Sequence, residues 1–276
     1  MMNLFRNIEE VKAIGQIPIN SLINADCFEV LPYVADKSVD LVLCDLPYGI
    51  TALGWDSTLP LDKLWVEYKR VLKRRGVVIL TSAQPFTWKV CASNPSWFKD
   101  EIIWEKPNGT NPLQTAFRPF RVHENILVFY DEQPTYNPQM TYGHPQYSGF
   151  EDLTKYIGEV YNGDDPGKEK KLISKHRKNT DGSRFPRSIQ RFAQDRGGEH
   201  PTKKPVDLMA WLVRSYTNPG DLVLDNTMGA GTTCVASLKE GRAFIGIELD
   251  TIYYERAVLA VKRELLNWRV KCPSEG

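Results

Sequence analysis

The sequence has no long hydrophobic run. None of its apolar stretches approaches the roughly 18 residues that a membrane-spanning helix needs. Residues 1–6, MMNLFR, lack the charged, apolar and small-residue order of a secretory leader. We therefore expect a cytoplasmic protein without a membrane partner.

The sequence also lacks paired cysteines. Its five cysteines are widely spaced and odd in number, and no two form a C-x-x-C pair; they are Cys27, Cys44, Cys91, Cys234 and Cys272. A disulfide framework or a zinc site requires closer and paired spacing. We expect reduced thiols and no bound metal.

Net charge is small, which argues against a uniformly basic nucleic-acid protein. The 276 residues carry 35 Lys and Arg against 34 Asp and Glu, a net charge of +1. The distribution is uneven, because residues 168–196 hold ten Lys or Arg against three acids, a local charge of +7. A polyanion would meet this segment first.

Strand and helix patterns alternate along most of the chain, which predicts an α/β fold with a mainly parallel sheet. Expected strands cover residues 19–24, 40–44, 77–80, 102–104, 124–130, 221–225 and 243–248. Expected helices cover residues 26–34, 61–73, 86–92 and 203–216, one beginning near 232, and 251–268. Residues 1–18 lack a strong period, so we assign them no element.

One short stretch, Asp45-Leu46-Pro47-Tyr48-Gly49, closes the apolar run 40–44. In open α/β sheets, the carboxyl end of a buried strand faces the crevice where ligands bind. Asp45 supplies a carboxylate there and Tyr48 an aromatic face, a combination that suits a planar, nitrogen-bearing substrate. Taken alone, so short a pattern also fits an ordinary strand followed by a turn.

A second region carries the pattern of a nucleotide-type cofactor. The apolar run 221–225 leads into Gly229-Ala230-Gly231 and a helix beginning near Thr232. Glycines there allow backbone amides to approach a ligand closely, and a helix N-terminus favours an anionic group. The next apolar run ends at Glu248, about 20 residues after the glycines, as expected for a carboxylate that binds ribose hydroxyls.

Together these stretches resemble the amino-group DNA methyltransferases that use S-adenosylmethionine, found in bacteria and phages. Residues 45–48 resemble the D-P-P-Y catalytic motif, and 225–233 resemble D-P-F-x-G-S-G-T-T. Residues 24–27 resemble the G-D-C turn, 104–108 W-x-K-P-N, and 200–205 H-P-T-x-K-P. The catalytic motif precedes the cofactor motif, as in the β class, and several ordered matches are more specific than any one.

The resemblance implies a Rossmann-like methyltransferase fold, a mainly parallel twisted sheet with helices on both faces and an inserted target-recognition region. On this view residues 1–130 form the catalytic half, 131–198 the insertion, and 199–276 the cofactor-binding half. The insertion is rich in aromatic and basic residues, although such a composition is also typical of a disordered loop. Phosphates of double-stranded DNA would contact Lys170, Lys171, Lys175, Arg177, Arg184 and Arg187.

The resemblance also implies the activity, methylation of adenine N6 in double-stranded DNA. Catalysis would involve Asp45, Leu46, Pro47 and Tyr48. Binding of S-adenosylmethionine would involve Asp26, Cys27, Asp45, Thr202, Lys204, Asp225, Gly229, Gly231, Thr232, Thr233 and Glu248. Helix capping is the alternative role for Asp26 and for Thr202, because both stand where a helix is expected to begin.

The chain departs from the family pattern at three positions, and the identity of residue 45 also bears on this assignment. Leu46 replaces the first proline of the catalytic motif, and Asn226-Thr227 replaces Pro-Phe in the cofactor motif, which removes an aromatic cover. Asp45 favours adenine, since the cytosine-N4 enzymes usually carry Ser at that place. Methylation of cytosine N4 and a catalytically weak DNA-binding relative stay open as alternatives, as does a homodimer.

Cys44 adjoins the catalytic motif, but amino-group methylation needs no covalent nucleophile. A cysteine nucleophile is required for methylation of cytosine carbon 5. We therefore expect Cys44 to be a residue of the strand core.

Overall fold

The computed structural model describes residues 2–49, 58–110, 115–145, 181–194 and 204–271. Contacts divide the chain into two units, one of Met1–Asn137 with Arg187–Gly276 and the other Pro138–Pro186. All the helices and strands named below belong to the first unit. Within the described residues, none of the helices has the length and apolar character needed to cross a membrane.

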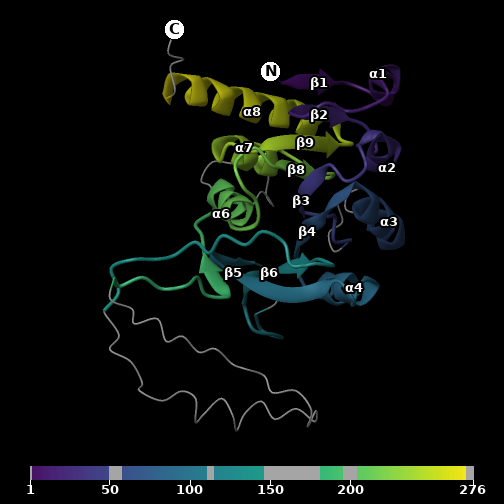
Figure 1. The fold of residues 1–276 in the computed structure, drawn as a ribbon. Coiled ribbons are helices and arrows are strands. Elements are labelled where there is room, and N and C mark those ends of the chain that lie inside the picture. The colour runs from purple at the N-terminus through teal and green to yellow at the C-terminus, as the bar shows by residue number, and fades with distance from the viewer. Residues whose placement is uncertain (1, 50–57, 111–114, 146–180, 195–203, 272–276) are drawn as a thin grey trace, which may run out of the picture. The chain divides into compact units, whose positions relative to one another are not determined.

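Strands and helices alternate through the first unit (Figure 1). The strands are β1 (Asn3–Phe5), β2 (Ser21–Asn24), β3 (Val39–Cys44), β4 (Leu72–Ser82), β5 (Phe98–Thr110), β6 (Arg121–Phe129), β7 (Ile189–Arg191), β8 (Leu222–Asp225) and β9 (Ala243–Glu248). The helices are α1 (Ile8–Ile14), α2 (Cys27–Val30), the 3-10 turn η1 (Leu31–Tyr33), α3 (Leu61–Val71), α4 (Phe86–Ser93), α6 (Val206–Tyr216), α7 (Thr232–Lys239) and α8 (Thr251–Lys271).

These strands form one sheet in the order β1-β2-β9-β8-β3-β4-β6-β5-β7. Neighbours from β1 to β4 run parallel, whereas β6 is antiparallel to both β4 and β5. The short strand β7 pairs in parallel with β5, although its residues fall in the segment predicted as an insertion. The prediction of an α/β fold with a mainly parallel sheet is confirmed.

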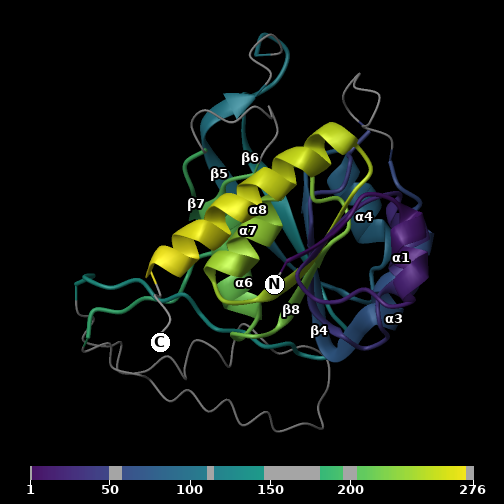
Figure 2. The same ribbon diagram turned by 90° about the horizontal axis from the view of Figure 1, so that it is seen from above.

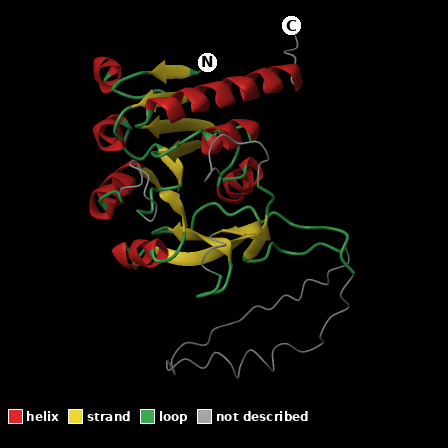
Figure 3. Ribbon diagram, turned by 180° about the vertical axis from the view of Figure 1, so that it is seen from behind, coloured by secondary structure: helices red, strands yellow, loops and turns green. Residues whose placement is uncertain are grey.

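Helices cover both faces of the sheet. Figures 1, 2 and 3 show α1, α2, α3 and α4 on one face and α6, α7 and α8 on the other. Alternate residues of β3 serve the two sides: Val42 packs in the cluster that contains Tyr68 of α3, and Leu43 in the cluster that contains Leu212 of α6. Burial on both faces explains why β3 reads as a continuous apolar run.

The N-terminal residues are ordered into two elements that the sequence pattern did not reveal. β1 pairs with β2, and α1 is capped by Asn7, whose Oδ1 accepts a hydrogen bond from the Glu10 amide at 3.0 Å. Three strand residues and seven helical residues are too few to establish a period of 2 or 3.6.

Two predicted helices end earlier than expected. The helix predicted over 61–73 stops at Val71, because Leu72 already pairs with Val39 as the first residue of β4. The helix predicted over 26–34 divides into α2 and η1. Pro32 lies at this break, and a proline has no N–H with which to continue an α-helical ladder.

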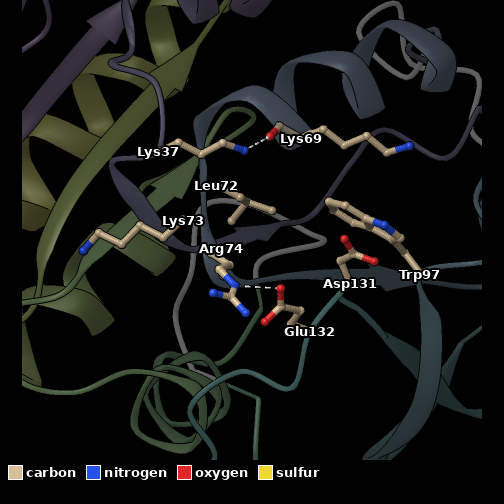
Figure 4. A pocket seen from close by; sticks show the side chains of 9 residues that line it. Lys37, Lys69, Leu72, Lys73, Arg74, Trp97, Asp131 and Glu132 are labelled. Atoms are coloured by element: carbon tan, nitrogen blue, oxygen red, sulfur yellow. Dashed lines mark hydrogen bonds and ion pairs between the residues drawn. The ribbon is translucent and has the colours of Figure 1, made fainter.

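A pocket of about 220 Å³ lies where β3 and β4 begin (Figure 4). It is lined by Lys37, Lys69, Leu72, Lys73, Arg74, Gly76, Trp97, Asp131 and Glu132. Arg74 pairs with Glu132 at 2.7 Å, Lys73 with Asp40 at 2.7 Å, and Lys37 donates to the Lys69 carbonyl. These ion pairs hold together the edge of the sheet opposite to the carboxyl ends of β3 and β4.

Candidate active site

The residues predicted for chemistry and for cofactor binding gather at one edge of the sheet. β2, β9, β8, β3 and β4 are parallel neighbours, so their carboxyl ends point the same way. Asp45 follows β3, Asp225 ends β8 and Glu248 ends β9. In open α/β sheets this edge is where ligands bind.

Three side chains donate to the Asp45 carboxylate. Tyr48 and Thr81 both donate to Oδ1, at 2.7 and 2.5 Å, and the Lys204 ammonium donates to Oδ2 at 2.6 Å. A carboxylate accepts about four hydrogen bonds. Asp45 is fixed from three sides, and its side chain, 29% exposed, still has room for a further donor.

Lys204 belongs to a buried row of alternating charges. Its ammonium lies 2.6 Å from Asp45 and 3.2 Å from Glu124, and Glu124 also pairs with Lys106. Burial lowers the pKa of Lys204, but the carboxylates of Asp45 and Glu124 raise it more, so the net pKa lies above its ordinary value. The lysine predicted to bind the cofactor therefore contacts the predicted catalytic acid.

The Tyr48 ring stacks on Phe86, the first residue of α4. The two centroids are 5.3 Å apart with an interplanar angle of 26°, and the Lys204 ammonium lies 5.5 Å from the Tyr48 centroid. Burial, followed by the negative charges of Asp45 and Glu124, raises the pKa of Tyr48 well above its ordinary value. Tyr48 is therefore a neutral phenol that donates to Asp45.

A hydrogen bond joins the loop predicted to be catalytic with the loop predicted to bind the cofactor. The Thr227 hydroxyl donates to the Asp45 carbonyl at 3.2 Å, and the Thr227 amide donates to Asp225 Oδ1 at 3.1 Å. Thr227 stands where the family motif has Phe. The substitution removes an aromatic ring and supplies a hydroxyl that ties the two loops together.

Cys44 is fully buried at the end of β3. Its thiol donates to Asn226 Oδ1 at 3.0 Å, and the Tyr68 hydroxyl donates to the same oxygen at 2.7 Å. Burial raises the pKa of Cys44 well above its ordinary value, which disfavours the nucleophilic thiolate. Cys44 lies in the core, as expected.

Both glycines of the turn have positive φ angles, which favour glycine. Gly229 and Gly231 have φ values of +51° and +77°, and Gly231 caps α7. A Cβ at Gly231 would lie 2.8 Å from the Ala257 Cβ, so both the backbone angle and the packing require glycine. Thr232 and Thr233 open α7 and are buried.

Glu248 is held by two backbone amides at the end of β9. Gly229 N donates to Oε2 and Asp250 N donates to Oε1, each at 2.8 Å. Burial raises the pKa of Glu248, and these two hydrogen bonds oppose the shift. Each carboxylate oxygen retains capacity for one more donor, as a contact with ribose hydroxyls requires.

Asp26 caps α2, with its Oδ1 accepting from the Phe28 amide at 2.8 Å. This is the capping role that the sequence allowed; the other oxygen is not used by the cap. Cys27 is buried, and burial raises its pKa to about 11. Asp26 follows β2, the strand next to β9, so it stands at the same edge as Glu248.

Several predicted residues lie outside the described residues: Thr202, Lys170, Lys171, Lys175 and Arg177. Of the predicted DNA contacts, Arg184 and Arg187 are described. In the second unit, Arg184 forms a β-bridge with Thr141 and donates to the Pro145 carbonyl at 2.5 Å. Arg187, in the first unit, is exposed.

The sequence analysis missed Thr81, Lys106 and Glu124. Lys106 stood in a recognised motif without a role, and Thr81 and Glu124 each stood at one end of a predicted strand. A polar residue bordering an apolar strand was the available signal. It becomes informative only when β4, β5 and β6 are known to be neighbours in the sheet.

Comparison with known proteins identifies the family of this chain. The model of a DNA methylase family, of the N6/N4 type, covers residues 39–259. The chain belongs to this family. The type II methyltransferase M1.MboII of Moraxella bovis is 27% identical over 269 residues, covering 91% of this chain and 100% of that protein.

Two further relatives extend the comparison. The DNA adenine methyltransferase YhdJ of Escherichia coli is 26% identical over 260 residues, covering 84% of this chain and 79% of that protein. The crystal structure of the M1.HpyAVI–SAM complex aligns with a TM-score of 0.56 and 23% identity, covering 86% of this chain and 98% of the other. This DNA methylase therefore shares the fold of a solved methyltransferase, in a family that acts on amino groups of DNA.

The buried Asp225 leads to a prediction about pH. Burial raises its pKa to about 7, from near 4 in an unfolded chain, although hydrogen bonds from Thr233 and Thr227 oppose the shift. Between pH 4 and 7 the folded state therefore holds a proton that the unfolded state has lost. Folding stability contributed by this group falls as pH rises through that window.

We expect Asp225→Asn to remove this dependence. The free energy of unfolding of the variant, minus that of the wild type, should be larger at pH 8 than at pH 5 by on the order of a few kcal/mol. Urea denaturation of both proteins at the two pH values measures the difference, in which other titrating groups cancel. An equal difference at both pH values would show that Asp225 is already ionised at pH 5.

Proposed function

We propose that this DNA methylase transfers the methyl group of S-adenosylmethionine to the exocyclic N6 of an adenine flipped out of double-stranded DNA. The observation that carries the proposal is the position of Asp45. Its carboxylate accepts hydrogen bonds from three side chains, one of them the hydroxyl of Tyr48. It follows β3, which pairs with β8, the strand that leads into the predicted cofactor loop.

The chemistry explains why a fixed carboxylate is needed. The lone pair of the adenine amine is delocalised into the ring, which makes the nitrogen a poor nucleophile. Asp45 Oδ2 and the Leu46 carbonyl would each accept a hydrogen bond from one N–H group of the amine. These two hydrogen bonds would favour a pyramidal nitrogen with an available lone pair. The contacts to Tyr48, Thr81 and Lys204 orient the carboxylate before the base arrives.

The cofactor residues fit S-adenosylmethionine. Glu248 offers oxygens to ribose hydroxyls, Asp26 stands on the neighbouring strand end, and a Cβ on Gly229 would meet only open space. M1.HpyAVI was solved as a SAM complex, which supports the same donor here. When bound, the cofactor supplies an electrophilic methyl group on a sulfonium; this chain's residues orient the acceptor nitrogen.

Adenine is favoured over cytosine by two observations. Residue 45 is Asp, and YhdJ, a relative of 26% identity, is a DNA adenine methyltransferase. Cytosine N4 is the second candidate, because the family includes enzymes of both types and the two amines need similar acceptors.

The basic segment 168–196 is the proposed DNA contact. Its local charge of +7 suits phosphates, and it includes Arg184 and Arg187 together with Lys170, Lys171, Lys175 and Arg177. Phosphate contacts position the duplex and do not read sequence.

Product analysis tests the function. Purified protein is incubated with methyl-labelled cofactor and mixed-sequence duplex DNA, and the digested nucleosides are identified by mass spectrometry. We expect N6-methyladenine from the wild type and about a hundredfold to a thousandfold less from Asp45→Ala, because removal of a positioned electrostatic group costs about that much. N4-methylcytosine would establish the second candidate, and no methylated base would refute both.

Tyr48 variants separate the ring from the hydroxyl. Tyr48→Phe keeps the ring and leaves Thr81 as a donor to Oδ1, so we expect a loss within about tenfold in kcat/KM. Tyr48→Ala removes the stacking surface and should lose a further tenfold to hundredfold. Equal losses in the two variants would mean that the hydroxyl, not the ring, carries the role; thermal unfolding checks that the Ala variant is folded.

Glu248→Gln tests the cofactor site. The amide presents an N–H group to one of the two backbone donors, so both the turn and the ribose contact are weakened. We expect Kd for S-adenosylmethionine to rise at least tenfold, about 1.4 kcal/mol. Calorimetric titration measures this, with Glu255→Gln, an exposed change on α8, as the matched control. Unchanged affinity would remove Glu248 from the site.

A further inference from the structure

Four side chains form a row of alternating charge that leads inward from the catalytic edge. From the edge they are Asp45, Lys204, Glu124 and Lys106. Their side chains are 29%, 5%, 12% and 7% exposed, so solvent screens the outermost member most. The role of this row rests on the proposed function, because it concerns how Asp45 acts.

Each member comes from a different segment of the chain. Asp45 follows β3, Lys204 precedes α6, Glu124 lies on β6 and Lys106 on β5. Glu124 pairs in register with Trp104, two residues before Lys106, and the Lys106 ammonium lies 5.2 Å from the Trp104 ring centroid. The inner pair is thus fixed by the β5–β6 ladder, and it presents one carboxylate oxygen to Lys204.

A buried ammonium next to a single carboxylate would weaken the site. Lys204 lies 2.6 Å from Asp45 Oδ2, where it cancels much of the negative charge that Asp45 presents to its open side. Methyl transfer to a neutral amine places positive charge on that nitrogen before its proton leaves. If the lysine cancels most of the charge of the Asp45 carboxylate, the carboxylate stabilises the positively charged nitrogen poorly.

Glu124 offsets the ammonium from the other side. Its Oε2 lies 3.2 Å from the Lys204 nitrogen, so the lysine shares its charge between two carboxylates. Lys106 pairs with the other oxygen, Oε1, of this buried carboxylate, whereas Oε2 contacts Lys204 as an ion pair without hydrogen-bond geometry.

We propose that Glu124 is a positioning residue for methyl transfer: it holds and offsets the Lys204 ammonium, so that Asp45 is oriented by the lysine and still presents negative charge to the target nitrogen. Lys106 supports Glu124 in this arrangement. Neither residue contacts the reacting atoms.

The surroundings of Lys204 agree with this role. Among the described residues, the charged or titratable groups that face it are Asp45, Glu124 and the Tyr48 ring, and Glu124 is faced by Lys106. Burial lowers the pKa of Lys204 and the two carboxylates raise it above its ordinary value. Removal of Glu124 takes away one of the two raising charges, so the pKa of Lys204 must fall.

Glu124→Gln tests the proposal in two ways. We expect kcat to fall at least tenfold relative to the wild type. KM for DNA and for S-adenosylmethionine should stay within about threefold of the wild-type values, because the residues proposed to bind them are unchanged. The pKa of Lys204, followed by NMR of ¹³C-labelled lysine and assigned with Lys204→Met, should fall by about one unit or more. This second readout requires no methyl transfer.

Two further variants make the result specific. In Lys106→Met/Glu124→Gln the unpaired Lys106 charge is gone, so we expect a fold at least as stable as that of the single variant. Both kcat and the pKa of Lys204 should stay as low as in the single variant, because the Glu124 carboxylate is still absent. Glu132→Gln removes a carboxylate from the Arg74 pair at the opposite edge of the sheet and should leave kcat and the pKa of Lys204 unchanged.

The outcomes are distinguishable from those of the function test. A wild type that methylates no base refutes the proposed function and, with it, a role for Glu124 in methyl transfer. A wild type that methylates DNA, with Glu124→Gln unchanged in kcat or in the pKa of Lys204, refutes the proposal about Glu124 alone. If the single variant does not fold, the same two measurements on the double variant decide, since it also lacks the Glu124 carboxylate.

Discussion

The hydrogen bond from Lys204 to Asp45 joins two parts of the chain that lie 159 residues apart. It closes the site, because the catalytic motif follows β3 near the beginning of the sequence and the cofactor motif follows β8 near its end. β3 and β8 are neighbours in the sheet, so the lysine that precedes α6 reaches Asp45 from the segment predicted to bind the cofactor. The candidate site forms only when both segments have assembled.

Further contacts across the same junction support this closure. The Asp40 carboxylate at the start of β3 accepts from the Leu222 amide at 2.9 Å, and the Thr227 hydroxyl reaches the Asp45 carbonyl at the other end. Both contacts connect residues 182 positions apart in the sequence. The two strands are therefore fixed at both ends, and the catalytic loop cannot shift along the sheet without breaking them.

The same edge concentrates buried charge, which opposes folding. Burial raises the pKa of Asp225 and of Glu248, and it opposes the charged form of Lys204. Backbone amides, hydroxyls and opposite charges offset part of this penalty, as at Glu248, which accepts from Gly229 N and Asp250 N. The large apolar clusters on the two faces of the sheet supply the stability that such a site requires.

The sequence by itself determined the carboxyl ends of β2, β3, β8 and β9, the glycines of the turn and the family. These features are local: the apolar run 40–44 marks a buried strand, and the positive φ angles of Gly229 and Gly231 follow from glycine spacing in a turn. Only the tertiary structure decided the partners of Asp45. Thr81, Glu124 and Lys106 carry no local pattern that connects them with residue 45, and they meet it because β3, β4, β6 and β5 are successive strands in the sheet. Strand order and register depend on packing between distant segments, so no period within one segment encodes them.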